Sequence, residues 1–221
     1  FGDSVMHIAE GILSGPVLAS GIALAAAGTG IGLKKLDFNR IPHAGILSAA
    51  FFVASLIHVP IGPSSAHLIL NGLVGLLLGW GAFPAILVAL TLQAVFFQFG
   101  GITTLGVNTI VMALPAVLCY ALFGKIVHRS RTPTFFAAAF ACGFLSVFLS
   151  SLLLGLALVF TEESFLEVSA MVIAANLPVM IIEGIITAAC LGFLQKVQPE
   201  LLPGSPAESG REQSVNTKQS E

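Results

Sequence analysis

Between Ile41 and Gly124 the chain reads IPHAGILSAAFFVASLIHVPIGPSSAHLILNGLVGLLLGWGAFPAILVALTLQAVFFQFGGITTLGVNTIVMALPAVLCYALFG, 84 residues without one Asp, Glu, Lys or Arg. A soluble domain of this length needs charged side chains over its surface. Across all 221 residues, 56% are hydrophobic and 9% are charged, against about 25% charged in an ordinary globular protein. The apolar runs are also too long and too uniform for barrel strands, which alternate and span in about ten residues. The sequence therefore predicts a helical integral membrane protein and excludes a soluble or disordered chain.

The composition excludes several functions. The net charge is −2 and the basic residues are scattered, so no basic face for nucleic acid is expected. The cysteines Cys119, Cys142 and Cys190 are widely spaced within apolar runs, which indicates packing residues rather than a disulfide or zinc framework. The glycine-rich stretch from Gly28 to Lys34 does not match a phosphate-binding loop. Any ATP that drives this protein must be hydrolysed by another chain.

Seven segments are apolar enough to be read as membrane-crossing, since a helix needs about 20 residues to span the bilayer core. They are roughly Leu13–Leu33, Ala44–Pro60, His67–Leu78, Pro84–Phe99, Val107–Val127 with Pro115 as an expected kink, Phe135–Phe160, and Ser169–Leu194. The third is short for a full span and is expected to be tilted, re-entrant or partly interfacial.

The nine basic residues support the count of seven. They lie between the first two spans, between the fifth and sixth, and after the seventh: Lys34, Lys35, Arg40, Lys125, Arg129, Arg131, Lys196, Arg211 and Lys218. Seven spans place all of them on one side, which the positive-inside rule makes cytoplasmic. We therefore expect an all-α protein of about seven transmembrane helices, with its N-terminus outside and its C-terminus inside. Residues 1–12 would be an extracytoplasmic segment, 13–195 the transmembrane domain, and 196–221 a disordered cytoplasmic tail.

Three histidines, His7, His58 and His67, lie near the outer face in this topology and can converge there. Imidazole is the commonest protein ligand of transition metals, so this group is a candidate metal site. The alternative is that each is a hydrogen-bonded interfacial histidine, because the spacings match no standard zinc motif. His43 and His128 fall in basic loops and are expected to be solvated.

Two further features carry polar groups at unusual places. The outer loop from Gln98 to Asn108 contains paired glycines, and its Gln98, Thr103, Thr104 and Asn108 side chains can hydrogen-bond ligand histidines. A tight turn between two helices is the alternative. Glu183 is the only acid within an apolar span, which makes it a functional candidate by default. It can equally be a hydrogen-bonded packing element.

Four segments, in register, resemble the CbiM/NikM family. They are Met6-His7-Ile8-Ala9-Glu10-Gly11, Pro63-Ser64-Ser65-Ala66-His67-Leu68, the loop from Gly100 to Asn108, and Ile182-Glu183-Gly184-Ile185-Ile186-Thr187. The resemblance covers about Met6 to Leu194. This family comprises the substrate-specific membrane components of energy-coupling factor (ECF) transporters for cobalt and nickel.

The resemblance implies a transporter subunit, not an enzyme, in the inner membrane of a prokaryote. It captures Co(II) or Ni(II) at the outer face for import, to supply cobalamin or metalloenzyme synthesis. The implied partners are a transmembrane coupling subunit of the CbiQ/NikQ type, cytoplasmic ATPases of the CbiO/NikO type, and a small membrane subunit of the CbiN/NikN type.

The implied metal ligands are the amine of Met6, the main-chain nitrogen and imidazole of His7, and the imidazole of His67. An all-nitrogen set suits Ni(II) or Co(II) better than Mg(II) or Ca(II). His58, Gln98, Thr103, Thr104, Asn108 and Glu183 are candidates for support or gating. Glu10 in the opening motif leans the choice toward cobalt.

The sequence departs from the family pattern in two ways. Residues 1–5 precede Met6, so a free Met6 amine requires their removal, and Asp3 and Val5 make a poor cleavage site. The Gln98-Phe99-Gly100-Gly101 segment lacks the histidine often found before the family's paired glycines.

Two other classes of function are weighed. A stand-alone, proton-coupled metal transporter would use Glu183 and the histidines as a relay, but we find no inverted repeat in the sequence to support it. An intramembrane metal-dependent hydrolase needs a general base beside the metal, for which only Glu10 is available.

Overall fold

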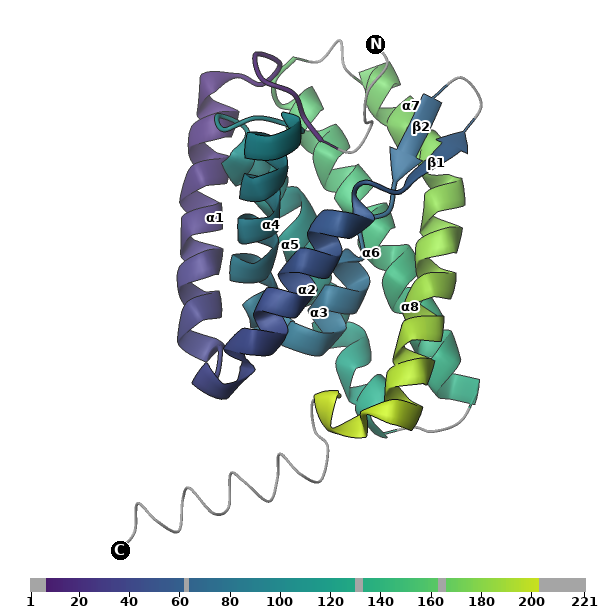
Figure 1. Ribbon diagram of the computed structural model, residues 1–221. Coiled ribbons are helices and arrows are strands. Elements are labelled where there is room, and N and C mark those ends of the chain that lie inside the picture. Colours follow the sequence, from purple (N-terminus) through teal and green to yellow (C-terminus); the bar gives the residue numbers. More distant parts are fainter. Residues whose placement is uncertain (1–6, 62–63, 130–132, 163–165, 203–221) are drawn as a thin grey trace, which may run out of the picture.

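The computed structural model describes residues 7–61, 64–129, 133–162 and 166–202, and the chain is mainly a bundle of helices (Figure 1). The helices are α1 (Gly15–Lys35), α2 (Ile41–Ala54), α3 (Asn71–Leu78), α4 (Ala82–Phe97), α5 (Leu105–Arg129), α6 (Pro133–Val159), α7 (Leu166–Ala175) and α8 (Leu177–Val197). Short 3-10 turns are η1 (Phe38–Arg40), η2 (Gly79–Gly81) and η4 (Pro199–Leu201). Two strands, β1 (His58–Ile61) and β2 (Ser64–His67), form an antiparallel hairpin.

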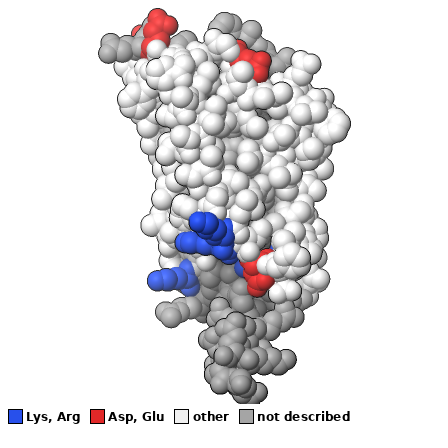
Figure 2. Space-filling view, turned by 90° about the vertical axis from the view of Figure 1, so that its left-hand side faces the viewer, with Lys and Arg blue, Asp and Glu red and all other residues white. Residues whose placement is uncertain are grey.

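The surface of the bundle suits a membrane. Among the described residues, five stretches of helical chain are long and apolar enough to cross one: Gly15–Lys35, Asn71–Phe97 (which η2 divides), Leu105–Val127, Pro133–Val159 and Leu177–Val197. Large apolar side chains point outward and are more than half exposed, as at Ile22, Ile46, Phe96 and Phe193. Figure 2 shows charged side chains at the two ends of the molecule, with an uncharged surface between them. The protein is therefore a multi-pass membrane protein. We call the end that carries Lys34, Lys35 and Arg40 the basic end.

Helices α3 and α4 form a helical hairpin within the Asn71–Phe97 stretch. Gly79 ends α3 with a φ of +55°, a left-handed value that suits glycine, and η2 turns the chain. Gly75 packs on Ala116 and Gly79 on Tyr120, so α3 runs beside α5 toward the basic end. Helix α4 then returns to the opposite end (Figure 1). The eight residues of α3 extend only about 12 Å, which agrees with the expectation of a short, re-entrant third segment.

Two predicted spans need correction. The second was expected to be helical to Pro60, but α2 ends at Ala54 and the chain continues as β1. The chain is helical as predicted, apart from this short hairpin of residues 58–61 and 64–67. The seventh was expected to be one helix, but it divides at Asn176, the residue before α8. Pro178 explains this break, because proline lacks an N–H and disfavours continuation of a preceding helix.

Glycines on α1 allow the helices to approach closely. A Cβ at Gly21 would lie 2.3 Å from a methyl carbon of Val107, and a Cβ at Gly28 would lie 2.4 Å from the ring of Phe83. Small residues are common at helix contacts in membranes for this reason. Gly28 and Gly32 therefore lie within helix α1 and serve close packing against Phe83 and the η2 turn.

The helical part of the chain extends past the predicted start of the tail at residue 196. Helix α8 ends at Val197, η4 follows, and Leu202 is buried. Residues 203–221 lie outside the described residues, so disorder there stays a prediction. Helix α5 continues through Pro115.

Candidate metal centre

The β1–β2 hairpin delivers His67 to the interior. His67 ends β2, pairs in register with His58, and is 1% exposed. Its Nδ1 lies 3.0 Å from the carbonyl oxygen of Leu68. Since a carbonyl only accepts hydrogen bonds, Nδ1 carries the proton and Nε2 keeps the lone pair that a metal can use. The side chain of His58 is not among those described, so its proposed role stays a prediction.

The segment before α1 brings His7 to the same place, and Asn108 of α5 holds that segment. The N–H of Ile8 donates to Oδ1 of Asn108 over 3.1 Å, and Nδ2 of Asn108 donates to the Ile8 carbonyl over 3.3 Å. Nδ2 also donates to Thr104 Oγ1 over 3.2 Å. One buried amide thus satisfies both main-chain groups of the residue after His7. Asn108 was a candidate to orient an imidazole; its described hydrogen bonds are with the main chain of Ile8 and the side chain of Thr104.

The paired glycines let the loop before α5 touch the N-terminal segment. A Cβ at Gly100 would lie 2.6 Å from Asn108 Nδ2, and one at Gly101 would lie 2.1 Å from Cγ of Glu10. Both glycines have positive φ, +77° and +142°. Glu10 accepts a hydrogen bond from the N–H of Thr103 over 3.2 Å. The loop and the start of α5 therefore hold residues 8–10 at both ends, through Asn108 at Ile8 and the N–H of Thr103 at Glu10.

The two imidazoles meet in a pocket closed by an aromatic ring. The ring centroids of His7 and His67 are 4.9 Å apart, with planes inclined by 19°. Phe99 stacks on both, at 6.0 Å from His7 and 6.4 Å from His67. Phe99 directly precedes Gly100 and Gly101, the position at which a histidine was expected from the resemblance. Its ring excludes water from the imidazoles without adding a ligand.

Burial gives His7 the properties of a neutral ligand. The side chain is 7% exposed, and neither ring nitrogen has a hydrogen-bond partner within the described part of the chain. Burial, with a smaller contribution from His67, holds the pKa of His7 well below its ordinary value of 6.5. A buried imidazole with two unpaired nitrogens is costly unless a ligand binds it.

Two imidazoles alone do not complete a metal shell. Among the described residues no group of three or more His, Cys, Asp and Glu side chains is arranged to hold a metal. Met6, the predicted source of a further nitrogen, lies outside the described residues. The carboxylate of Glu10 accepts a hydrogen bond from the N–H of Thr103 and is exposed.

Glu183 lies on α8 and supports the chain just after His67. Its carboxylate, which is fully buried, accepts hydrogen bonds from the N–H groups of Ile69 and Leu70; the bond from Leu70 measures 2.9 Å. Leu70 is left-handed, with a φ of +58°, and α3 begins at the next residue. The carboxylate therefore caps the N-terminal end of α3, where unpaired N–H groups favour negative charge.

Gln98, like Thr103, is exposed and does not belong to the buried part of the site. Gln98 is left-handed, with a φ of +57°, and it ends α4. Sequence reasoning did not single out Phe99 or Ile8 as parts of the site. The presence of an aromatic residue directly before the paired glycines was the available signal for Phe99.

The sequence matches a known protein family over most of its length. Residues 7–201 match the family described as the cobalt uptake substrate-specific transmembrane region, CbiM. A Haemophilus influenzae protein assigned by name to metal transport is 40% identical over 199 residues, covering 89% of this chain and 97% of that one.

Two longer relatives are fusions. One from Methanocorpusculum labreanum is named as a fused cobalt transport protein, CbiMQ, and is 30% identical. The match includes 89% of this chain and 36% of the relative. The nickel transport protein NikMN of Rhodobacter capsulatus is 32% identical, with 89% of this chain matching 64% of it. A crystal structure of a transition metal transporter, 28% identical, superposes with a TM-score of 0.75 over 87% of this chain and 93% of the other.

Proposed function

Because this chain belongs to the CbiM family of cobalt-uptake transmembrane proteins, we propose that it is the substrate-binding subunit of an ATP-driven ECF transporter. It captures Co(II) or Ni(II) at the outer face of a prokaryotic inner membrane and performs no covalent chemistry. One observation carries the proposal: His7 and His67, far apart in sequence, stack in a buried pocket, and His7 has no hydrogen-bond partner there among the described residues.

The proposed ligands are four nitrogens. Nε2 of His67 and a ring nitrogen of His7 supply two, and the main-chain nitrogen of His7 and the amine of Met6 supply the others. Consecutive nitrogens of Met6 and His7 would form fused chelate rings with the ion. Such rings favour square-planar coordination, which suits Ni(II), or Co(II) with the same ligands. The stacked rings must rotate for both to direct a lone pair at one ion.

The supporting residues have distinct proposed roles. Asn108, Thr103 and Thr104 dock the N-terminal segment that carries His7. Glu183 fixes the backbone that follows His67. Because its carboxylate is already engaged by two N–H groups, this contact favours a positioning role over a proton relay or a metal ligand.

The proposed topology has seven passages through the membrane. Helix α2 makes one short passage, and the β1–β2 hairpin together with α3 makes another. Helices α7 and α8 together make a single passage. The basic end then faces the cytoplasm by the positive-inside rule, and the His7–His67 pocket faces outward. Partners of the CbiQ and NikN types are suggested by the names of the fused relatives, CbiMQ and NikMN. ATPases of the CbiO/NikO type are proposed because the chain has no nucleotide motif.

The test is metal titration of the purified protein by calorimetry, with Co(II) and Ni(II) in separate experiments. Protein that begins at Met6 is expected to bind one ion tightly, and protein that begins at Phe1 more weakly. His67→Ala is expected to abolish binding, while His43→Ala, at the basic end, leaves it unchanged. Unchanged binding by His67→Ala would contradict the site, and equal binding by both starting points would exclude the Met6 amine.

A further inference from the structure

Gln93, on the buried face of α4, is a polar side chain without a partner among the described residues. It is 0% exposed, and neither Oε1 nor Nε2 has a hydrogen-bond partner. Among the buried side chains with two polar atoms in the described chain, only His7 shares this condition. A buried amide without hydrogen bonds costs free energy. Its presence therefore requires an explanation other than packing.

Helix α4 places Gln93 level with the histidine pocket, at the end opposite the basic end. Helices α1, α4 and α5 pack side by side, with Phe83 of α4 against Gly28 of α1 and Val107 of α5 against Gly21 of α1. Because a helix rises about 1.5 Å per residue, Val107 lies about 10 Å nearer that end than Phe83, and Gln93 lies about 15 Å nearer. Gln93 is therefore level with the start of α5, where hydrogen bonds hold the N-terminal segment.

Contacts on both sides of Gln93 tie it to the pocket. Its carbonyl accepts a hydrogen bond from the N–H of Phe99 over 3.4 Å, and the Phe99 ring stacks on both imidazoles. Ala89, one turn before Gln93 on the same face, belongs to one apolar core with Ile8 and Ile69. Ile8 directly follows one histidine, and Ile69 comes two residues after the other. The Gln93 amide therefore lies inside the protein beside the segments that carry the histidines.

The two imidazoles differ in the groups that hold them. Nδ1 of His67 lies 3.0 Å from the carbonyl oxygen of Leu68, which accepts its N–H and leaves Nε2 for an ion. A neutral imidazole that binds an ion through one nitrogen carries its proton on the other. Metal-binding histidines almost always donate this N–H to an oxygen. Neither ring nitrogen of His7 has a partner among the described residues, so an ion on His7 would leave a buried N–H that needs an acceptor.

We infer that Oε1 of Gln93 accepts the N–H of His7 when the ion binds, which makes Gln93 a positioning residue of the proposed metal site. Asn108, another buried amide at this level, already pairs with Ile8 and Thr104 and is not free for this role. Without the ion, the Gln93 amide and the His7 ring are both unpartnered. Pairing them in the loaded protein removes that cost and so favours binding.

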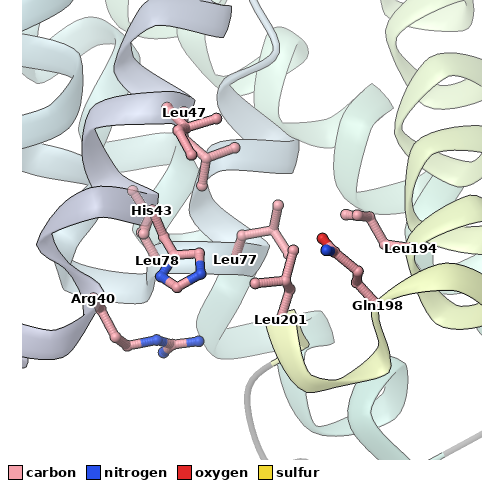
Figure 3. A pocket seen from close by; sticks show the side chains of 9 residues that line it. Arg40, His43, Leu47, Leu77, Leu78, Leu194, Gln198 and Leu201 are labelled. Atoms are coloured by element: carbon pink, nitrogen blue, oxygen red, sulfur yellow. The ribbon is translucent and has the colours of Figure 1, made fainter.

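Two other buried atoms without partners among the described residues lie away from the histidines. Nδ1 of His43 lies on the wall of a cavity of about 510 Å³ at the basic end (Figure 3). Oγ1 of Thr187 lies on α8, where a Cβ at Gly143 would be 2.6 Å from it. Thr187 therefore offers a control that shares the unpartnered state of Gln93 but not its place.

The inference rests on the proposed metal site, and its test is the variant Gln93→Leu. Calorimetric titration with Co(II) and Ni(II) should show binding weakened about 10–100-fold, the usual effect of removing the partner of a metal-binding histidine. The unfolding temperature of the metal-free chain should instead rise by about 2–4 °C, because two unpartnered polar atoms are removed. A merely structural residue would lower both quantities, so a loss of both would overturn the inference.

Matched variants separate the possible outcomes. Gln93→Glu keeps an oxygen acceptor at the same place and should restore most of the affinity that Gln93→Leu loses. Thr187→Val removes an unpartnered hydroxyl and should raise the unfolding temperature without changing metal affinity. Wild-type affinity in Gln93→Leu, or an equal loss in Gln93→Glu, would overturn this inference alone. Absence of metal binding by the unaltered chain would overturn the proposed function together with it.

Discussion

Replacing Asn108 by Leu tests how the metal pocket is assembled. Asn108 is 2% exposed and Ile8 is 3% exposed. The Asn108 amide is the partner of both main-chain groups of Ile8. Leucine has the same branching and the same number of side-chain heavy atoms but offers neither donor nor acceptor, so the shape of the side chain is kept while both hydrogen bonds are lost.

The expected size follows from these contacts. An unpaired buried polar group costs about 1–3 kcal/mol, so two of them cost at least about 2 kcal/mol while the segment stays docked. This cost favours the detached state, in which water pairs these groups but His7 leaves the pocket. Because the metal needs the docked segment, its affinity should fall about 30-fold, which corresponds to about 2 kcal/mol.

Calorimetric titration with Co(II) and Ni(II) measures this change, and thermal unfolding without metal shows that the variant is folded. Asn176→Leu is the matched control. Asn176 is a fully buried amide that donates to Ser151 over 3.0 Å, and its loss removes a hydrogen bond outside the metal pocket. We expect the control to keep its metal affinity. Wild-type affinity in Asn108→Leu would refute the docking of His7 by Asn108.

Three other predictions concern the same pocket. Glu183→Ala should lower the unfolding temperature and weaken metal binding about tenfold or more, because two N–H groups at the start of α3 lose their acceptor. Glu183→Gln keeps one acceptor and should have a smaller effect on both. An Ala variant as stable as wild type would contradict the role of Glu183 as the acceptor for these N–H groups. Gly101→Ala should weaken metal binding, since its Cβ would collide with Glu10 and its φ of +142° disfavours any side chain; Gly30→Ala, where the added Cβ meets open space, should bind normally. Below pH 6.5 the unfolded chain protonates His7 while the folded chain, with its lowered pKa, does not, so the metal-free protein should lose stability as the pH falls from 6.5. This loss should be smaller in His7→Phe when unfolding temperatures at pH 7.5 and 5.5 are compared, and an equal loss would refute it.

The membrane character and most helices could be predicted from the sequence, because hydropathy over 20 residues is a strong signal. The α1, α4, α5 and α6 predictions lie within about two residues of the observed ends. The meeting of His7 with His67 was also predictable, since charge placement put both near one face. These inferences use properties that a whole segment shares.

The errors arise where single residues or long-range contacts decide. The run from Ser55 to Pro60 is apolar enough for a helix, and a short apolar run does not distinguish helix from strand. The role of Glu183 depends on Ile69 and Leu70, over one hundred positions away, and no local pattern shows that pairing. Asn108 was a candidate to orient a ligand histidine, and its contacts with Ile8 could not be foreseen because the two residues are 100 positions apart.

X-ray absorption spectroscopy of the cobalt- or nickel-loaded protein that begins at Met6 tests the central claim most directly. We expect a metal edge and fine structure from nitrogen ligands alone, with the outer-shell scattering of two imidazoles. That scattering should be absent in His67→Ala, which is expected not to bind the metal. An oxygen-rich, six-coordinate shell without imidazole scattering would contradict the assignment of His7 and His67 as the metal ligands.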